Sequence, residues 1–333
     1  MNVLYAIQGT GNGHLCRAMD MVPCLRKHAN VDILVSGTQA DINLPFDVKY
    51  RLNGLSFIFG KHGGVDLWKT FIHSKFRLFI KEVNACPVQD YDLVINDFEP
   101  VSSWACNLKE KFCIGLSHQA AAVHHSAPKT EEVDRLGKFI LKHYAPHDEA
   151  YGFHFKPYAD NIFTPIIRQQ VREQERSNNG HYTVYLPSYD DEALLGYLSR
   201  FPDVEWEVFS KHNKRKFREK NIFFQPIDNT LFIESMAKSE GVLCGAGFET
   251  PAEALFLKKK LLVIPMKNQY EQHLNAAALR DIGVPVIRNT KPENDVYIRD
   301  WLQSDKIVNV NYDDEADTIV QSILERHANN IYS

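Results

Sequence analysis

Two successive series of short apolar runs, separated by longer helix-like or polar stretches, most constrain how this chain can fold. The runs are continuously apolar rather than alternating, as expected for strands that helices cover on both faces. Strands that alternate with helices in this way form the parallel sheets of α/β proteins. We expect strands of the first series at residues 3–8, 31–36, 93–96 and 112–116, with a helix over about 15–28. We expect strands of the second series at residues 182–186, 204–209, 222–224, 241–244, 261–265 and 285–288.

The two series are similar in size, and the turn-forming run Ser-Asn-Asn-Gly that ends at Gly180 lies between them. At roughly 150 residues per domain, a chain of 333 residues suggests about two domains. We therefore expect an N-terminal Rossmann-like domain (1–165), a linker (166–179) and a C-terminal Rossmann-like domain (180–333), with a cleft between the domains. The pattern weakens over residues 120–160, where we expect a large loop region that could shape a binding site.

Composition excludes several classes of protein. Lys plus Arg number 38 and Asp plus Glu 42, so the net charge of −4 argues against a globally basic protein and predicts no nucleic-acid partner. No apolar run approaches the ~18 residues that span a bilayer, and no basic segment of a signal peptide opens the chain. The six cysteines include no Cys-x-x-Cys pair, which argues against a zinc site or a redox motif. Thiols scattered in this way indicate a cytoplasmic protein.

One strongly basic segment runs from Lys211 to Lys220 (KHNKRKFREK) and holds six Lys or Arg in ten residues. It can be a solvated loop between two strands. It can also contact anionic lipid headgroups, where each basic residue is worth ~1 kcal/mol, so peripheral binding to the inner membrane face stays open.

The first expected strand leads into a glycine-rich turn, Gly-Thr-Gly-Asn-Gly-His, that ends at His14. Glycines at a strand-to-helix turn let the backbone approach a ligand closely. The spacing departs from the dinucleotide fingerprint, since the third glycine, Gly13, comes one residue early and the second strand ends without an acidic residue. His14 can cap the helix, but a His at the carboxyl end of a strand is also suited to act as a general base.

Three further side chains follow strands of the same series. Asp97 closes an apolar run and is the best candidate to orient His14, although it can also be a turn residue. Glu99 is a second carboxylate within reach. His118 follows the next strand and could face the same cleft, or could only hydrogen-bond a loop.

The second series contains another glycine-rich turn, Gly-Ala-Gly, that ends at Gly247. Thr250 suits the N-cap of the helix that follows, and Thr250 with Glu253 has the Thr-x-x-Glu spacing of a capping box. The free N–H groups and the helix dipole at such a turn suit a diphosphate. After the next strand, Glu271 and Gln272 could hydrogen-bond sugar hydroxyls or could simply begin a solvated helix.

Three segments together resemble the nucleotide-sugar-dependent glycosyltransferases of the GT-B fold. They are residues 9–17 (GTGNGHLCR), 92–100 (DLVINDFEP) and 247–272 (GFETPAEALFLKKKLLVIPMKNQYEQ). The sequence is similar to poorly characterised prokaryotic members. It is more distantly similar to the lipid II-forming N-acetylglucosaminyltransferase of peptidoglycan synthesis and to plant glucosyltransferases. The likeness covers both halves and is strongest over about 222–283.

The resemblance implies that the N-terminal half binds the acceptor and the C-terminal half the nucleotide-sugar. His14 would be the catalytic base and Asp97 its partner, with Glu99 and His118 as candidates on the acceptor side. Glu253 would hold the ribose. The other residues implied for the donor are Gly13, Ser188, Gln225, Ile227, Gly247, Phe248, Thr250, Glu271 and Gln272.

The resemblance implies an inverting, metal-independent transfer of a sugar from a nucleotide-sugar to an acceptor hydroxyl, and it favours a UDP-sugar as the donor. The nucleotide-sugar is then a substrate, and we expect no cofactor and no metal site. The acceptor can be a lipid, a glycan, a protein or a small molecule. Three alternatives of the same fold stay open: a nucleotide-sugar hydrolase, a nucleotide-sugar 2-epimerase and a non-catalytic sugar-nucleotide-binding protein. The joint presence of His14, Asp97 and Glu253 argues against the last.

Overall fold

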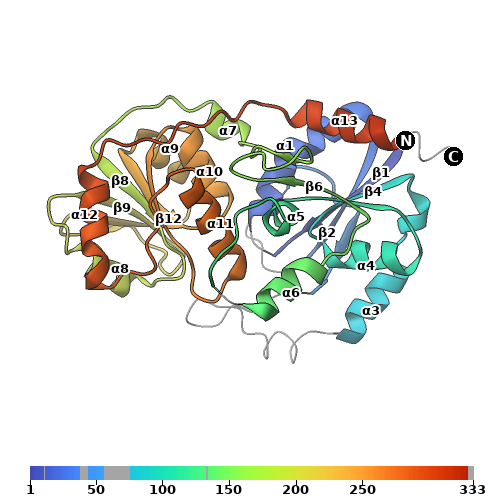
Figure 1. Ribbon diagram of the computed structural model, residues 1–333, viewed down its shortest axis with the longest axis horizontal. Helices are drawn as coiled ribbons and strands as arrows, with labels where there is room; N and C mark the ends of the chain where they lie inside the picture. Colours follow the sequence, from blue (N-terminus) through green and yellow to red (C-terminus); the bar gives the residue numbers. More distant parts are fainter. Residues whose placement is uncertain (11, 38–43, 56–75, 133, 329–333) are drawn as a thin grey trace.

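The structure of the chain is a computed structural model that describes residues 1–10, 12–37, 44–55, 76–132 and 134–328. Two α/β halves lie side by side, each built around a mostly parallel sheet (Figure 1). Each half has the doubly wound, Rossmann-like plan that the sequence predicts.

The N-terminal sheet has the strand order β3-β2-β1-β4-β5-β6-β7, and every neighbouring pair is parallel. The order reverses at β1, and ligands bind at such switch points in open α/β sheets. The strands are β1 (Asn2–Gln8), β2 (Asn30–Ser36), β3 (Tyr50–Leu52), β4 (Leu93–Asp97), β5 (Cys113–Ser117), β6 (Glu149–Phe153) and β7 (Ile162–Phe163). The helices are α1 (Asn12–His28), α3 (Phe76–Ala85), η1 (Val88–Asp90), α4 (Pro100–Leu108), α5 (His118–Val123) and α6 (Arg135–His143).

The C-terminal sheet has the order β10-β11-β9-β8-β12-β13, and only the pairing of β10 with β11 is antiparallel. The strands are β8 (His181–Tyr185), β9 (Glu205–Ser210), β10 (Phe217–Glu219), β11 (Ile222–Pro226), β12 (Gly241–Gly245) and β13 (Lys260–Ile264). The helices after β7 are α7 (Gln169–Arg172), α8 (Asp191–Leu198), α9 (Asn229–Lys238), α10 (Glu249–Phe256), α11 (Tyr270–Asp281), η2 (Pro292–Asn294), α12 (Asp295–Gln303) and α13 (Ala316–Ala328).

The chain returns to its N-terminal half at the end. After α12 the chain crosses back from the second half, and helix α13 packs against α1 (Figure 1). Asp317 of α13 lies 3.1 Å from Nε2 of His28. Buried side chains of α1, α10 and α13 (Leu15, Leu255 and Ile319) belong to one continuous apolar cluster. The cluster therefore joins the two halves. The domain boundaries expected from the sequence assign α13 to the second domain, but its buried face packs against the first.

Three expectations about local structure are wrong. Residues 285–288 form no strand; Val286 makes a single bridge to Val263, and Pro285 has no N–H to donate to a ladder. Residues 118–123, 135–143 and 149–153 form α5, α6 and β6 rather than one large loop. The expected linker, residues 166–179, includes the short helix α7. The basic segment is not only a loop, since β10 lies within it and forms an exposed edge strand.

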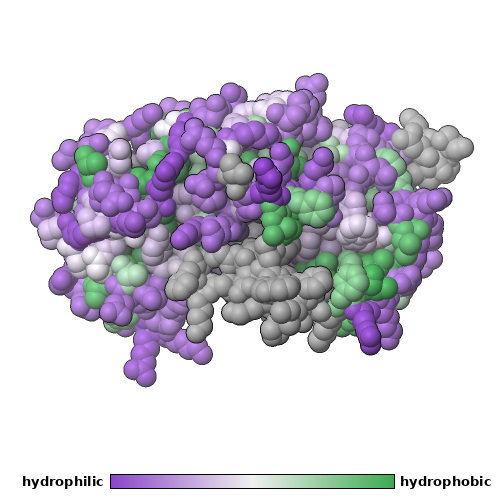
Figure 2. Space-filling view, turned by 60° about the horizontal axis from the view of Figure 1, so that its bottom comes forward, coloured by the Kyte–Doolittle hydropathy of each residue, from purple (hydrophilic) through white to green (hydrophobic). Residues whose placement is uncertain are grey.

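The surface in Figure 2 is mostly hydrophilic, with apolar side chains gathered on the N-terminal half at the lower right. Helix α3 exposes Phe76 and Ile80 in the described part of this half. None of the helices among the described residues is long and apolar enough to cross a membrane.

Candidate active site

The turn between β1 and α1 places His14 in the first turn of α1. The backbone N–H of Gly9 donates to the Ser36 carbonyl at the end of β2, with 2.6 Å between the two atoms. A Cβ at Gly9 would lie 2.8 Å from Val35 and 2.9 Å from the Ser36 oxygen, so only glycine allows this approach. The close turn points His14 along the carboxyl edge of the sheet.

His14 and Asp97 lie together, as the sequence predicts. Nδ1 of His14 is 2.8 Å from Oδ1 of Asp97, which ends the neighbouring strand β4. The His14 side chain is 12% exposed and Asp97 is fully buried. A ring proton on Nδ1 donates to the carboxylate and leaves the lone pair of Nε2 to accept a proton. This is the geometry of a base oriented by an acid.

Arg17 completes the site and is a residue that sequence reasoning missed. Its guanidinium donates to both oxygens of Asp97, with Nη2 2.8 Å from Oδ1 and Nε 3.1 Å from Oδ2. Burial alone would raise the pKa of Asp97, but the positive charge of Arg17 and the contact with His14 outweigh it and lower the pKa. The position of Arg17, three residues after His14 on one helix face, is a signal that could have revealed it.

Arg17 also crosses to the other half of the molecule. Its Nη1 lies 2.7 Å from Oε1 of Glu249, the first residue of α10. Burial raises the pKa of Glu249 to about 7, against the lowering effect of Arg17 and with a further rise from Glu253. Gly13 also lies at this contact between the two halves. A Cβ at this position would be 3.3 Å from Cγ of Glu249, so there is little room for a larger residue.

Glu99 and His118 do not face the cleft, although the sequence offers both as candidates for its acceptor side. Glu99 is fully buried and caps α4, where it accepts hydrogen bonds from the backbone N–H groups of Val101 and Ser102. His118 is also buried. Its Nε2 contacts Oδ1 of Asn275 at 2.7 Å, and its ring stacks on Phe248 with 3.9 Å between centroids. These contacts make His118 part of the packing between the halves.

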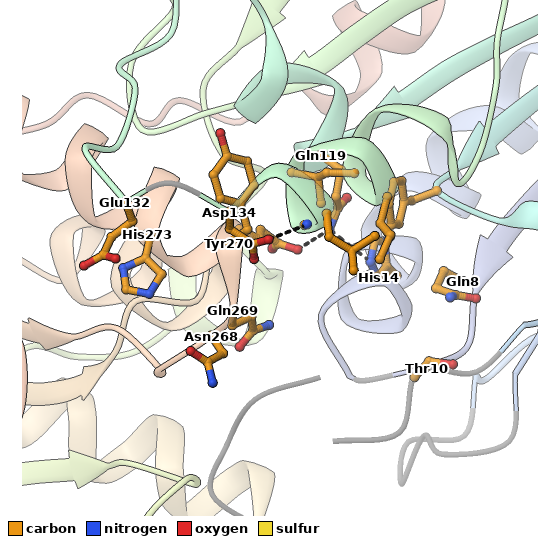
Figure 3. A pocket seen from close by; sticks show the side chains of 16 residues that line it. Gln8, Thr10, His14, Gln119, Glu132, Asp134, Asn268, Gln269, Tyr270 and His273 are labelled. Carbon is orange, nitrogen blue, oxygen red and sulfur yellow. Dashed lines mark hydrogen bonds between the residues drawn. The ribbon is translucent and has the colours of Figure 1, made fainter. Parts of the chain in front are cut away.

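A cavity of about 500 Å³ opens beside His14 (Figure 3). Figure 3 shows side chains of the first half, such as Gln8 and Thr10, across from Asn268 and Gln269 of the second. The other lining residues are Phe98, Gln119, Glu132, Asp134, Leu136, Gly137, Ile140, Leu141, Tyr270, Glu271 and His273. The helix α6 therefore supplies one wall, at the place where the weak sequence pattern predicts a site-shaping segment.

The residues predicted for the donor lie after parallel strands of the C-terminal sheet. Ser188, Ile227 and Gly247 follow β8, β11 and β12 respectively, so their backbones meet at one sheet edge. Glu271 alone of the predicted donor residues lines the cavity. The side chains of Gln225 and Gln272 are buried and hydrogen-bond within the protein: Gln225 donates to Glu207, and Gln272 accepts from the N–H of Met266.

The predicted capping box at Thr250 and Glu253 is wrong. Helix α10 already begins at Glu249, and Phe248 precedes it without a side-chain cap. Phe248 is held by stacking on His118, and Glu249 is held by its pairing with Arg17. Because these contacts fix the backbone before Thr250, the helix begins upstream of Thr250.

Glu253 instead pairs with Arg168, which precedes α7. Nε of Arg168 lies 2.5 Å from Oε1 of Glu253, and Nη2 lies 2.8 Å from Oε2. The carboxylate is only 2% exposed. Such a two-pronged pair is strong and directional. No periodic pattern marks Arg168, so sequence reasoning had no signal for it.

No group of three His, Cys, Asp or Glu side chains that could hold a metal ion occurs within the described ranges.

The model of glycosyl transferase family 1 matches residues 1–304. The chain belongs to this family. Membership makes the protein a glycosyltransferase, as the resemblance implies. No curated protein sequence matches the chain.

Solved structures similar to this member of glycosyl transferase family 1 cover nearly its whole length. MurG from Acinetobacter baumannii is 13% identical, with a TM-score of 0.54 over 98% of this chain and 99% of that chain. UGT89C1 from Arabidopsis thaliana, complexed with UDP, is 12% identical, with a TM-score of 0.54 over 98% and 94%. A UDP-N-acetylglucosamine 2-epimerase is 15% identical, with a TM-score of 0.55 over 99% and 97%. At these identities the similarity establishes the fold, which is GT-B.

Proposed function

We propose that this glycosyltransferase moves a sugar from a UDP-sugar to an acceptor hydroxyl, with inversion at the anomeric carbon and without a metal ion. The observation that carries the proposal is the 2.8 Å contact between Nδ1 of His14 and Oδ1 of Asp97 at the wall of the cavity. A base held in this way is poised to take a proton from a ligand in the cavity, and general-base catalysis typically contributes 10²–10⁴-fold.

The proposed reaction is a single displacement. Nε2 of His14 takes the proton of the acceptor hydroxyl as its oxygen forms a bond to the anomeric carbon. The bond between that carbon and the diphosphate breaks, and the diphosphate leaves with the electron pair. Asp97 stabilises the imidazolium that forms, and Arg17 holds Asp97 ionised.

The proposed place of the diphosphate is the turn between β12 and α10. A Cβ built at Gly247 meets no atom within 4 Å, so the backbone there has open space for a ligand. The N-terminal N–H groups of α10 favour an anion in this space. Ser188 and Thr250 are proposed to contact the phosphates, and the backbone from Gln225 to Ile227 the base.

Glu253 is proposed to accept hydrogen bonds from the ribose hydroxyls, as the resemblance implies. Its pairing with Arg168 sets a condition on this role. The ribose must share the carboxylate with Arg168 or displace it. Glu271, which lines the cavity, is proposed to contact the donor sugar together with Gln272.

Peripheral membrane contact through the segment from Lys211 to Lys220 is a separate proposal. The segment lies at the exposed edge of the C-terminal sheet, around β10. The affinity for vesicles of phosphatidylglycerol, measured by co-sedimentation, should fall by about a hundredfold or more when Lys211, Lys214, Arg215 and Lys216 are changed to Ala, since each contributes ~1 kcal/mol. Equal binding of both proteins would show that the segment is only a solvated edge.

Product analysis tests the proposed reaction against its alternatives. The protein is incubated with labelled UDP-glucose or UDP-N-acetylglucosamine and a panel of acceptors, in the presence of EDTA. A glycoside of inverted configuration supports the proposal. Free sugar would instead indicate a hydrolase, an isomerised UDP-sugar an epimerase, and tight UDP binding without any product a non-catalytic protein.

A further inference from the structure

Two buried glutamines in the cavity wall have side-chain oxygens that accept no hydrogen bond from a described residue. They are Gln8, which is 3% exposed, and Gln119, which is 5% exposed, and the unpartnered atom of each is Oε1. Both side chains line the cavity beside His14 (Figure 3). Leaving a buried carbonyl oxygen without a hydrogen-bond donor destabilises the folded protein by about 1–3 kcal/mol. A ligand in the cavity that donates hydrogen bonds to these two oxygens would remove this cost.

The orientation of the Gln8 amide follows from its neighbours. The hydroxyl of Tyr144 donates to the carbonyl of Leu55 and therefore accepts from Gln8, whose Nε2 lies 2.7 Å from it. The amide nitrogen must face Tyr144, and the oxygen is left as the free atom.

The orientation of the Gln119 amide is fixed in the same way. Its Nε2 lies 3.2 Å from Oε2 of Glu271 and 3.4 Å from Nε2 of His14. A carboxylate oxygen accepts hydrogen bonds, so the amide nitrogen of Gln119 must face Glu271. The free oxygen of Gln119 is therefore an acceptor that lies next to the proposed base.

Besides the imidazoles of His14 and His273, the charged side chains among the described lining residues are acidic. Glu132, Asp134 and Glu271 line it, and the described lining residues include no Lys or Arg. Gln269 adds a further side-chain oxygen without a described partner. The cavity thus offers carboxylates and carbonyl oxygens, which attract positive charge and hydrogen-bond donors and disfavour phosphate or carboxylate groups.

One wall of the cavity is apolar. Leu136, Ile140 and Leu141 of α6 line it together with Phe98. Asp134 is the N-cap of the same helix, and its Oδ1 accepts from the N–H of Gly137 at 2.7 Å. The apolar wall and the acceptor-rich wall therefore meet at the start of α6, and the cavity suits a ligand with one polar and one apolar side.

We propose that the acceptor of this enzyme is a hydroxyl-rich molecule that carries a primary amine, such as an amino sugar with an apolar substituent, and not a phosphorylated one. This inference rests on the proposed function for the identity of the cavity as the acceptor site. The ammonium group lies toward Glu132 and Asp134, and hydroxyl groups donate to the free oxygens of Gln8 and Gln119. One hydroxyl then lies within reach of His14.

Three matched probes test the proposal by calorimetry: octyl 2-amino-2-deoxyglucoside, its N-acetylated form and its 6-phosphate. The amine probe should bind at least about tenfold more tightly than the N-acetyl probe, since a charge-assisted hydrogen bond is lost on acetylation. The phosphate probe should bind most weakly. The double variant Glu132→Gln with Asp134→Asn should bind the amine and N-acetyl probes about equally. Asn at 134 preserves the cap of α6. Glu131→Gln, which changes an exposed neighbour outside the cavity, should keep the full preference.

The outcomes separate this inference from the proposed function. Binding of the phosphate probe as tight as that of the amine probe, or an unchanged preference in the double variant, overturns the acceptor class. Failure of the amine probe to bind while UDP still binds also overturns it and leaves the transferase proposal standing. A protein that binds no UDP and transfers no sugar to any acceptor overturns the proposed function itself.

Discussion

Arg17 and Glu249 form an ion pair between the two halves of the molecule, with 2.7 Å between Nη1 and Oε1. The same guanidinium holds Asp97, so one cation touches both the partner of the proposed base and the start of the proposed diphosphate-binding helix. The acceptor side and the donor side of the site are thus connected through one buried side chain.

Stability should fall as the pH rises from about 4.5 to 7 because of Glu249. Its pKa is raised from 4.5 to about 7 in the folded protein, so the folded state binds more protons than the unfolded state in this window. Protonation of Glu249 therefore adds about 1–3 kcal/mol to the free energy of unfolding below pH 4.5, and this stabilisation is lost as the pH rises through 7. Urea unfolding of wild type and Glu249→Gln from pH 4 to 8 measures the difference. Parallel curves for the two proteins would contradict the assigned pKa.

Asp97→Asn should reduce both activity and stability. An amide cannot balance the charge of Arg17 or stabilise imidazolium at His14, so kcat should fall by about 10–100-fold, less than on loss of the base itself. Breaking the buried pair should lower the free energy of unfolding by about 2–4 kcal/mol. Steady-state kinetics and urea unfolding measure the two effects. Asp90→Asn, an exposed carboxylate in η1, is the matched control. An active Asp97→Asn enzyme would remove Asp97 from the mechanism.

Glu253→Gln should destabilise the protein and weaken UDP binding. The change leaves the largely buried Arg168 without its ionic partner, which should lower the free energy of unfolding by about 2–4 kcal/mol. Loss of a charged acceptor for the ribose should weaken UDP binding by roughly ten- to a hundredfold. Calorimetry with UDP and with 2′,3′-dideoxy-UDP separates the effects, since wild type and variant should bind the dideoxy nucleotide about equally. Unchanged UDP affinity in a destabilised variant would leave Glu253 with a structural role alone. Glu293→Gln, which is exposed, serves as the control.

The sequence predicts the parts of the fold and the site that depend on local pattern. Continuous apolar runs correctly indicate the central strands of both sheets, because such strands are buried on both faces. Asp97 and His14 are correctly paired because both follow neighbouring parallel strands. The short edge strands β3, β7 and β10 escape detection, since strands of two or three residues are too short to show a periodic pattern.

Contacts between distant segments explain the remaining errors. Glu99 has the local pattern of a site carboxylate, but its acceptor capacity is taken up by the N-terminus of α4 and by Ser36. His118 follows a strand as expected, yet the other half of the molecule covers it. Helix α13 packs against α1 because it covers apolar side chains of the N-terminal half. No local sequence pattern indicates which apolar surface a distant helix will cover.

The single-turnover rate of sugar transfer in His14→Ala shows whether His14 is the catalytic base. The measurement compares wild type and variant at saturating labelled UDP-sugar and acceptor in EDTA, with UDP affinity measured in parallel. We predict a rate lower by about 10²–10⁴-fold with nearly unchanged UDP affinity, because the base acts on the acceptor while the nucleotide binds the other half. Transfer by His14→Ala at the wild-type rate would contradict the account, since His14 would then not be the base.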